Sequence, residues 1–256
     1  MKILVCLKQA PARDSALEVN SAGDWIDDED VAVEMNEPDA YALEEALQLK
    51  EKHDGEVIAL SAGPASAASI LREALAKGAD RAILIEDDRY ARADALAVGR
   101  ALAAAAQRES PDLVLTGLQS DDFGYGQVGV IVAELLGLPH ATIIMSVEAG
   151  DGSLQVKREL EAGWFQDVTL PLPGALSIQS GINKVRYATL MGIKKARKKP
   201  LDRVTPGDLG VAVENLQSVE RLYTPQKSKS TVFLEGSAKE QAEQLLEKLR
   251  HEARAL

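Results

Sequence analysis

Short apolar segments alternate with longer helix-forming segments from Met1 to His140 of this 256-residue chain. Four segments rich in Val, Ile and Leu predict strands that are covered on both faces, at residues 2–7, 56–62, 81–85 and 112–116. The intervening segments have apolar residues at helical spacing, at residues 39–52, 65–77, 93–108 and 126–136. This alternation predicts a doubly wound, Rossmann-like α/β fold around a mostly parallel sheet.

The pattern changes after residue 141. Segments 142–148 and 154–160 flank the turn at 150–152, and segments 166–172 and 174–179 add further strands. We therefore expect the sheet to gain antiparallel strands late in the chain. The insert at residues 8–36 contains a β-hairpin pattern at 17–20 and 24–27.

We expect two parts in the chain, an α/β nucleotide-binding domain at residues 1–200 and an extended C-terminal arm at residues 201–256. The arm ends in an amphipathic helix at about residues 237–255. Such an arm either wraps a partner or packs on its own domain, and composition favours neither.

The composition argues against several classes of function. Cys6 is the single cysteine and three histidines are scattered, so no disulfide and no metal site is expected. A net charge of -11 argues against general nucleic-acid binding. No apolar run approaches the roughly 20 residues of a membrane span. Without a signal-peptide pattern, we expect a cytoplasmic protein that is not embedded in a membrane. Neither G-x-S-x-G nor H-E-x-x-H occurs, so no catalytic residue is predicted.

The loop at residues 117–129 is the most informative candidate for a ligand site. Parallel sheets bind ligands at the carboxyl ends of their strands, and this loop follows a predicted strand and precedes an apolar helix. Its glycines allow close approach of a ligand, and the first amides of the helix can hold a phosphate. The loop matches neither G-x-G-x-x-G nor a P-loop, and an ordinary capped loop explains it equally well. Capping alone likewise explains the helix starts near 36–39 and 61–65.

A basic segment contrasts with the acidic chain. Seven Lys and Arg residues and no acid lie between residues 184 and 199, around Leu190 and Met191. Such runs are usually solvated surface. An exposed apolar residue ringed by cations could also anchor a partner with an acidic rim. Nucleic acid is the weaker alternative, because aromatic residues do not interleave beyond Tyr187.

Several motifs, in one order, resemble the β subunit of electron-transfer flavoproteins. They lie at residues 3–8, 36–46, 61–65, 74–81, 117–129, 186–190 and 194–200. The resemblance implies that the chain binds AMP, or a second FAD in electron-bifurcating members, and helps enclose an FAD held mostly by a homologous α subunit. Such a heterodimer shuttles electrons from acyl-CoA dehydrogenase-type donors to a quinone reductase or another acceptor.

The resemblance also assigns residues to two roles. Nucleotide contacts are expected at Cys6, Asn36, Asp39, Ala62, Gly117, Gln119, Ser120, Asp121, Asp122, Gly126, Gln127 and Val128. A recognition loop is expected at 183–199, with partner contacts at Tyr187, Leu190, Met191, Ile193, Lys194 and Lys195. Leu190 would be its apolar anchor, and the arm 201–256 would pack on the α subunit.

Two alternatives stay open. An electron-bifurcating subunit would hold FAD where AMP otherwise sits and would oxidise NADH there, and the room beside the nucleotide decides between them. A stand-alone nucleotide sensor of the universal-stress type shares the α/β plan, although the basic loop and the C-terminal arm argue against it.

Overall fold

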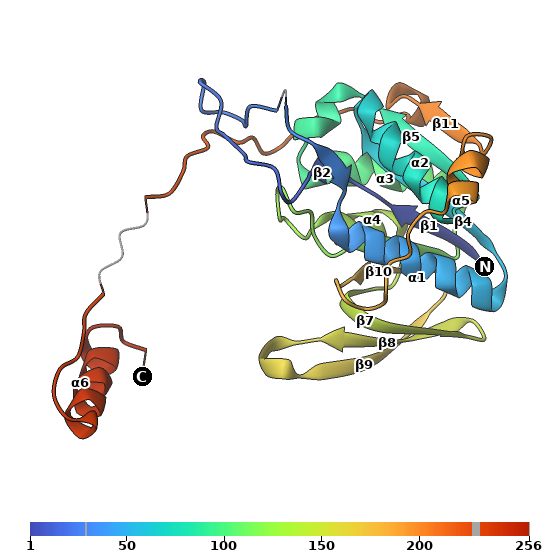
Figure 1. Cartoon of the computed structure of the whole chain (residues 1–256). Helices are drawn as coiled ribbons and strands as arrows, with labels where there is room; N and C mark the ends of the chain where they lie inside the picture. The colour runs from blue at the N-terminus through green and yellow to red at the C-terminus, as the bar shows by residue number, and fades with distance from the viewer. Residues whose placement is uncertain (29, 227–230, 256) are drawn as a thin grey trace. The chain divides into compact units, whose positions relative to one another are not determined.

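The computed structural model of this chain describes residues 1–28, 30–226 and 231–255 (Figure 1). The chain forms two compact units, Met1–Arg221 and Leu222–Leu256. A nine-stranded sheet organises the first unit, in the order β11-β5-β4-β1-β6-β10-β7-β8-β9. The predicted Rossmann-like α/β class is therefore confirmed.

The centre of the sheet consists of parallel strands. The four strands predicted first are all present, as β1 (Lys2–Cys6), β4 (Glu56–Gly63), β5 (Arg81–Glu86) and β6 (Leu113–Gly117). Each pairs in parallel with its neighbour, for example Leu4 with Ile58 and with Val114. Their residues are buried almost throughout because helices cover both faces of the sheet.

Helices cover both faces of the sheet, and each face has its own cluster of buried apolar side chains. One cluster gathers α1 (Glu37–His53) and α2 (Ala68–Lys77), which follows the short helix η1 (Ala65–Ala67). The other gathers η2 (Asp88–Arg92), α3 (Ala95–Glu109) and α4 (Val128–Leu136).

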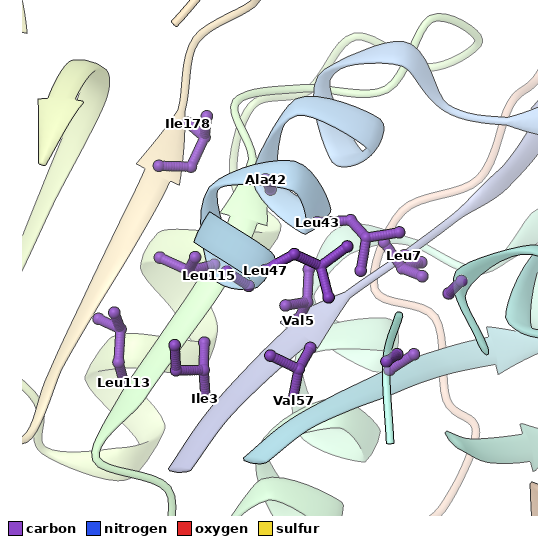
Figure 2. Packing of buried hydrophobic residues seen from close by; sticks show 14 of the residues in the cluster. Ile3, Val5, Leu7, Ala42, Leu43, Leu47, Val57, Leu113, Leu115 and Ile178 are labelled. Carbon is purple, nitrogen blue, oxygen red and sulfur yellow. The ribbon is translucent and has the colours of Figure 1, made fainter. Parts of the chain in front are cut away.

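Figure 2 shows how α1 covers the sheet. Leu43 and Leu47 on this helix lie over Val5 and Val57 of β1 and β4. Both leucines are at most 2% exposed. Full burial of such a side chain contributes about 1.5–3 kcal/mol, so this row fixes how α1 sits on the sheet.

The late strands form an antiparallel meander, as predicted. It comprises β7 (His140–Gly150), β8 (Ser153–Glu159) and β9 (Phe165–Pro171), with η3 (Glu161–Gly163) between the last two. The next strand, β10 (Gly174–Ile178), corrects the expectation for segment 174–179, because it runs parallel to both β6 and β7. All five of its residues are buried, as a strand in the interior of a parallel sheet requires.

The hairpin expected in the insert after β1 is present in reduced form. One antiparallel bridge joins Val19 and Ile26, and backbone hydrogen bonds join Asn20 to Trp25 and Asp27 to Glu18. The pairing that the sequence did not predict lies outside it, between β2 (Gln9–Pro11) and β3 (Val33–Met35). This pairing brings the two ends of the insert together.

The first unit extends past the expected boundary at residue 200. The reason is β11 (Leu201–Val204), which pairs with β5 as the edge of the sheet, and Val211 and Val213 pack on the apolar cluster beyond the short helix η4 (Gly207–Leu209). Helix α5 (Leu190–Ala196) lies just before β11.

The second unit contains the predicted terminal helix as α6 (Ala238–His251). Ser237 and Glu240 form a reciprocal capping box that satisfies amides of its first turn. None of the residues of this helix is buried. Residues 227–230 of the expected arm lie outside the described residues. Within the described part of the chain, no helix is long and apolar enough to cross a membrane.

Candidate functional site

A cavity lies where β1, β4 and β6 end. It is open to solvent at its mouth, and the space counted together with that mouth is about 770 Å³. Ten of the twelve residues expected to contact a nucleotide line it: Cys6, Asn36, Asp39, Ala62, Gly117, Gln119, Ser120, Gly126, Gln127 and Val128. Four separate stretches of the chain thus meet at the carboxyl edge of the sheet, as doubly wound folds predict.

Asp39 is a buried brace at the base of this cavity. Its two carboxylate oxygens accept the backbone N–H groups of Lys8, at 2.7 Å, and Gly117, at 3.0 Å. These amides follow β1 and end β6, so one side chain from the first turn of α1 holds two strand ends in place. Burial raises the pKa of Asp39 to about 7, although hydrogen bonds from Lys8, Asn36 and Gly117 act in the opposite direction.

Asn36 braces the loop on the polar side of the cavity. Its side-chain nitrogen donates to the carbonyl of Gln119 at 3.0 Å, and its side-chain oxygen accepts the amide of Asp121 at 2.9 Å. The residue is 2% exposed. The sequence suggested a helix cap, but the N-cap position makes no side-chain capping bond. The amide instead determines the path of the loop after β6.

Asp121 and Asp122 are not brought to the cavity with the other ten residues. Both line a neighbouring pocket, together with Arg13 and Leu17. The Lys8 ammonium lies 2.6 Å from the Asp122 carboxylate and also donates to Ser120 at 3.3 Å. Partial burial acts to raise the pKa of Asp122, but the Lys8 charge and the bonds around it lower that pKa below its usual value. The Lys8–Asp122 ion pair therefore joins the loop after β6 to the chain just beyond the end of β1.

The start of α4 presents backbone amides at the cavity. Val128 and Gly129 line it, and no side chain among the described residues caps this helix. A Cβ on Gly129 would lie 2.4 Å from both Thr116 Oγ1 and Ser177 Oγ, so only glycine lets the helix start this close to the strand ends. Unpaired amides and the positive end of the helix dipole favour an anion here.

The rest of the wall is apolar and was mostly missed from the sequence. Tyr90, Ala93, Val98 and Leu102 line it from η2 and α3. Cys6 also lies there, and burial, with a smaller effect from Asp39, raises the pKa of its thiol far above the ordinary value. A thiol that burial keeps protonated in this way is unreactive. The sequence did not identify Tyr90 as a cavity residue, because only the packing of η2 against the sheet brings it there.

Aromatic side chains line the rim. Phe123 and Tyr125 stack at 5.3 Å between ring centroids, and Trp25 of the insert packs on Phe123 at the same separation. Lys8 Nζ lies 4.6 Å from the Phe123 centroid. The insert after β1 and the loop after β6 are therefore joined over the cavity mouth.

A second feature, the docking loop, comprises residues 183–199. Tyr187 is 92% exposed, Leu190 is 87% exposed and Met191 is 68% exposed. Ile193, Lys194 and Lys195 are also exposed on α5. All six residues expected to contact a partner are thus exposed.

Both ends of the docking loop are anchored to the domain. Arg186 donates to Glu44 at 2.8 Å and 3.0 Å and pairs with Glu51, while Asn183 donates to Glu45 at 3.0 Å. At the other end Lys199 Nζ donates to two backbone carbonyls at the end of α2. Burial acts to raise the pKa of Glu44, but the Arg186 guanidinium lowers it overall. Hydrogen bonds to α1 and to the end of α2 therefore hold both ends of the docking loop in place.

No group of His, Cys, Asp and Glu side chains within the described residues could hold a metal ion. The cavity lining offers backbone amides, polar side chains, the Lys8 ammonium, the Asp39 carboxyl and an apolar wall. Such a lining can bind and orient a small molecule with an anionic end.

Comparison with known proteins identifies the family. Residues 24–209 match the electron transfer flavoprotein domain. The chain is 40% identical to "Electron transfer flavoprotein subunit beta" of Methylophilus methylotrophus, over 96% of this chain and 97% of that protein. It is 36% identical to the human protein of the same name, over 92% of this chain and 93% of that one. A Bacillus subtilis relative so named is 37% identical, over 87% and 88% of the two chains. This chain belongs to the family of electron transfer flavoprotein beta subunits.

Proposed function

We propose that this chain is the non-catalytic, nucleotide-holding subunit of a heterodimeric electron carrier, with AMP in the cavity at the ends of β1, β4 and β6. The observation that carries the proposal is the convergence of ten expected contact residues on that cavity. Family membership supplies the electron-transfer role.

The residues present fit AMP. The uncapped amides at Val128 and Gly129 would hold the phosphate, and the apolar wall of η2 and α3 would accept a flat base. The polar groups of Asn36 and Asp39 are already satisfied within the protein, so their part is to shape the cavity.

The same proposal includes an α-type subunit that carries most of an FAD. When bound, FAD supplies the electron chemistry, and this chain helps exclude solvent from it. We further propose that the second unit, Leu222–Leu256, packs on that subunit. Leu245 and Leu246 of α6 are 49% and 39% exposed and would supply the apolar contact. The cytoplasm is the proposed location.

The docking loop would meet the donors. An acyl-CoA dehydrogenase-type donor with an acidic rim would receive Leu190 in a pocket, with Lys194 and Lys195 on the rim. Electrons would then pass to a quinone reductase or another acceptor. This surface is anchored on α1 and α2, so docking need not order it first.

An electron-bifurcating role, with a second FAD in place of AMP, is the alternative that nucleotide analysis of the purified complex distinguishes. The stand-alone sensor loses support, since the family match at residues 24–209 covers the basic loop as well as most of the cavity lining.

The test is nucleotide analysis of the complex. This chain is co-expressed with an α-type subunit, and the purified complex is denatured and its nucleotides quantified by chromatography. One FAD and one AMP per heterodimer supports the proposal. Two FAD and no AMP replaces it with bifurcation, and NADH oxidation becomes the next assay. A stable homodimer of this chain alone without nucleotide would overturn the carrier role.

A further inference from the structure

Tyr90, a residue of the cavity wall, carries a buried hydroxyl that has no hydrogen-bond partner among the described residues. Tyr90 lies in η2, and the residue is 4% exposed. Its hydroxyl oxygen is buried and bonds to no group among the described residues. Burying a hydroxyl unpaired is costly, and native proteins keep few such groups without a reason.

The surroundings of Tyr90 are apolar. Ala93 and Leu102 belong to the same buried cluster, and Val98 packs against it. Burial, with a smaller effect from Asp87, raises the pKa of Tyr90 to about 12. The hydroxyl therefore stays protonated near neutral pH, where it can both donate and accept a hydrogen bond.

The cavity thus suits a ligand with one anionic end and one neutral, largely apolar end. The amides at the start of α4 suit an anion. The apolar wall at Tyr90 would penalise a charge, but it suits a flat group with a neutral hydrogen-bonding atom. A nucleobase is such a group, because its faces are apolar and its edge carries neutral nitrogen atoms.

We propose that Tyr90 contacts the base of the bound nucleotide through its hydroxyl. The inference rests on the proposed function and adds to it the residue that recognises the base. A site built to hydrogen-bond a ligand atom rejects an analogue without that atom, because the protein group is then left unpaired.

The Tyr90→Phe variant removes one oxygen and keeps the ring that packs on the wall. Two opposite effects are expected. The nucleotide-free full chain should melt at a higher temperature than wild type, because the unpaired hydroxyl is gone. The dissociation constant for AMP, measured by calorimetry, should rise about three- to tenfold with the loss of one hydrogen bond. Binding of ribose 5-phosphate, which lacks a base, should be the same in both proteins.

The Tyr41→Phe variant is the matched control. Tyr41 packs on the cluster at the other face of the sheet, so the same chemical change there should leave AMP affinity unchanged.

Each outcome decides between the claims. Wild type that binds AMP, with equal affinity in Tyr90→Phe, overturns the base contact and leaves the proposed function standing. Wild type that binds no adenine nucleotide overturns the proposed function itself. Equal weakening of AMP and ribose 5-phosphate would assign the hydroxyl to the sugar phosphate and reject the base contact. A lower melting temperature for nucleotide-free Tyr90→Phe would mean that the hydroxyl already has a partner, which also overturns the inference.

Discussion

Replacing Asp39 by asparagine should change how the free energy of unfolding depends on pH. Burial raises the pKa of this carboxyl to about 7, against the opposing bonds from Lys8, Asn36 and Gly117. In the unfolded chain its pKa is about 3.9. Between these values the folded state holds a proton that the unfolded state has released. The stability that this group contributes is therefore present at the acidic end of the window and is lost as pH rises towards 7.

The magnitude follows from the two pKa values. Linkage makes the contribution of Asp39 about 2–3 kcal/mol larger near pH 5 than near pH 7.5. The Asp39→Asn variant cannot titrate, so the difference in unfolding free energy between wild type and variant should grow by about that amount on acidification. Other carboxyls cancel in this difference, because both proteins contain them.

Urea denaturation of both full chains at the two pH values is the assay. Asp112→Asn serves as a control for loss of a backbone hydrogen bond, because the exposed Asp112 accepts the Lys2 amide at 2.7 Å near the other end of β1. Parallel pH profiles for wild type and Asp39→Asn would refute the reasoning, since they would mean that this carboxyl has the same pKa folded and unfolded.

Three further predictions concern α4, the docking loop and the second unit. Gly129→Ala should lower nucleotide content and cost about 1–3 kcal/mol of stability, because its Cβ would lie 2.4 Å from two hydroxyl oxygens; thermal unfolding checks this against Gly150→Ala, which has room. Leu190→Ala should slow electron transfer from a donor dehydrogenase about tenfold or more, with nucleotide content unchanged and exposed Leu216→Ala as control. Truncation after Arg221 should weaken the heterodimer in gel filtration yet leave the melting temperature of the first unit intact.

The sequence predicted the elements whose environment is uniform along their length. Strands β1, β4, β5 and β6 are buried on both faces, so each is one continuous apolar run that needs no knowledge of its neighbours. The direction of β10 could not be predicted in the same way, because it depends on pairing with β6, about sixty residues earlier. Edge strand β11 was missed since its four residues are half exposed and too few for a pattern.

The candidate site was predictable in position but not in the roles of its parts. The loop after β6 was recognised as a candidate ligand site because it follows a predicted strand, whereas the start of α1 was assigned to the site only by the family resemblance. Asn36 and Asp39 were expected to contact that ligand, yet the polar atoms of both side chains form hydrogen bonds with the backbone of neighbouring segments. Such hydrogen bonds join residues far apart in the sequence, so the local spacing of residue types does not predict them. Tyr90 was missed because it reaches the cavity only through the packing of η2 against the sheet, which also joins segments far apart in sequence.

Helix α1 connects the two features that the proposed function needs. Asn36 just before it and Asp39 in its first turn fix the strand ends and the loop around the cavity. Further along the same helix, Glu44 and Glu45 hold Arg186 and Asn183 of the docking loop. The helix is packed along its length by fully buried leucines, so it cannot shift at one end without disturbing the other. If AMP binds at the cavity as proposed, it would therefore stabilise the helix that holds the base of the docking loop, although AMP itself transfers no electrons.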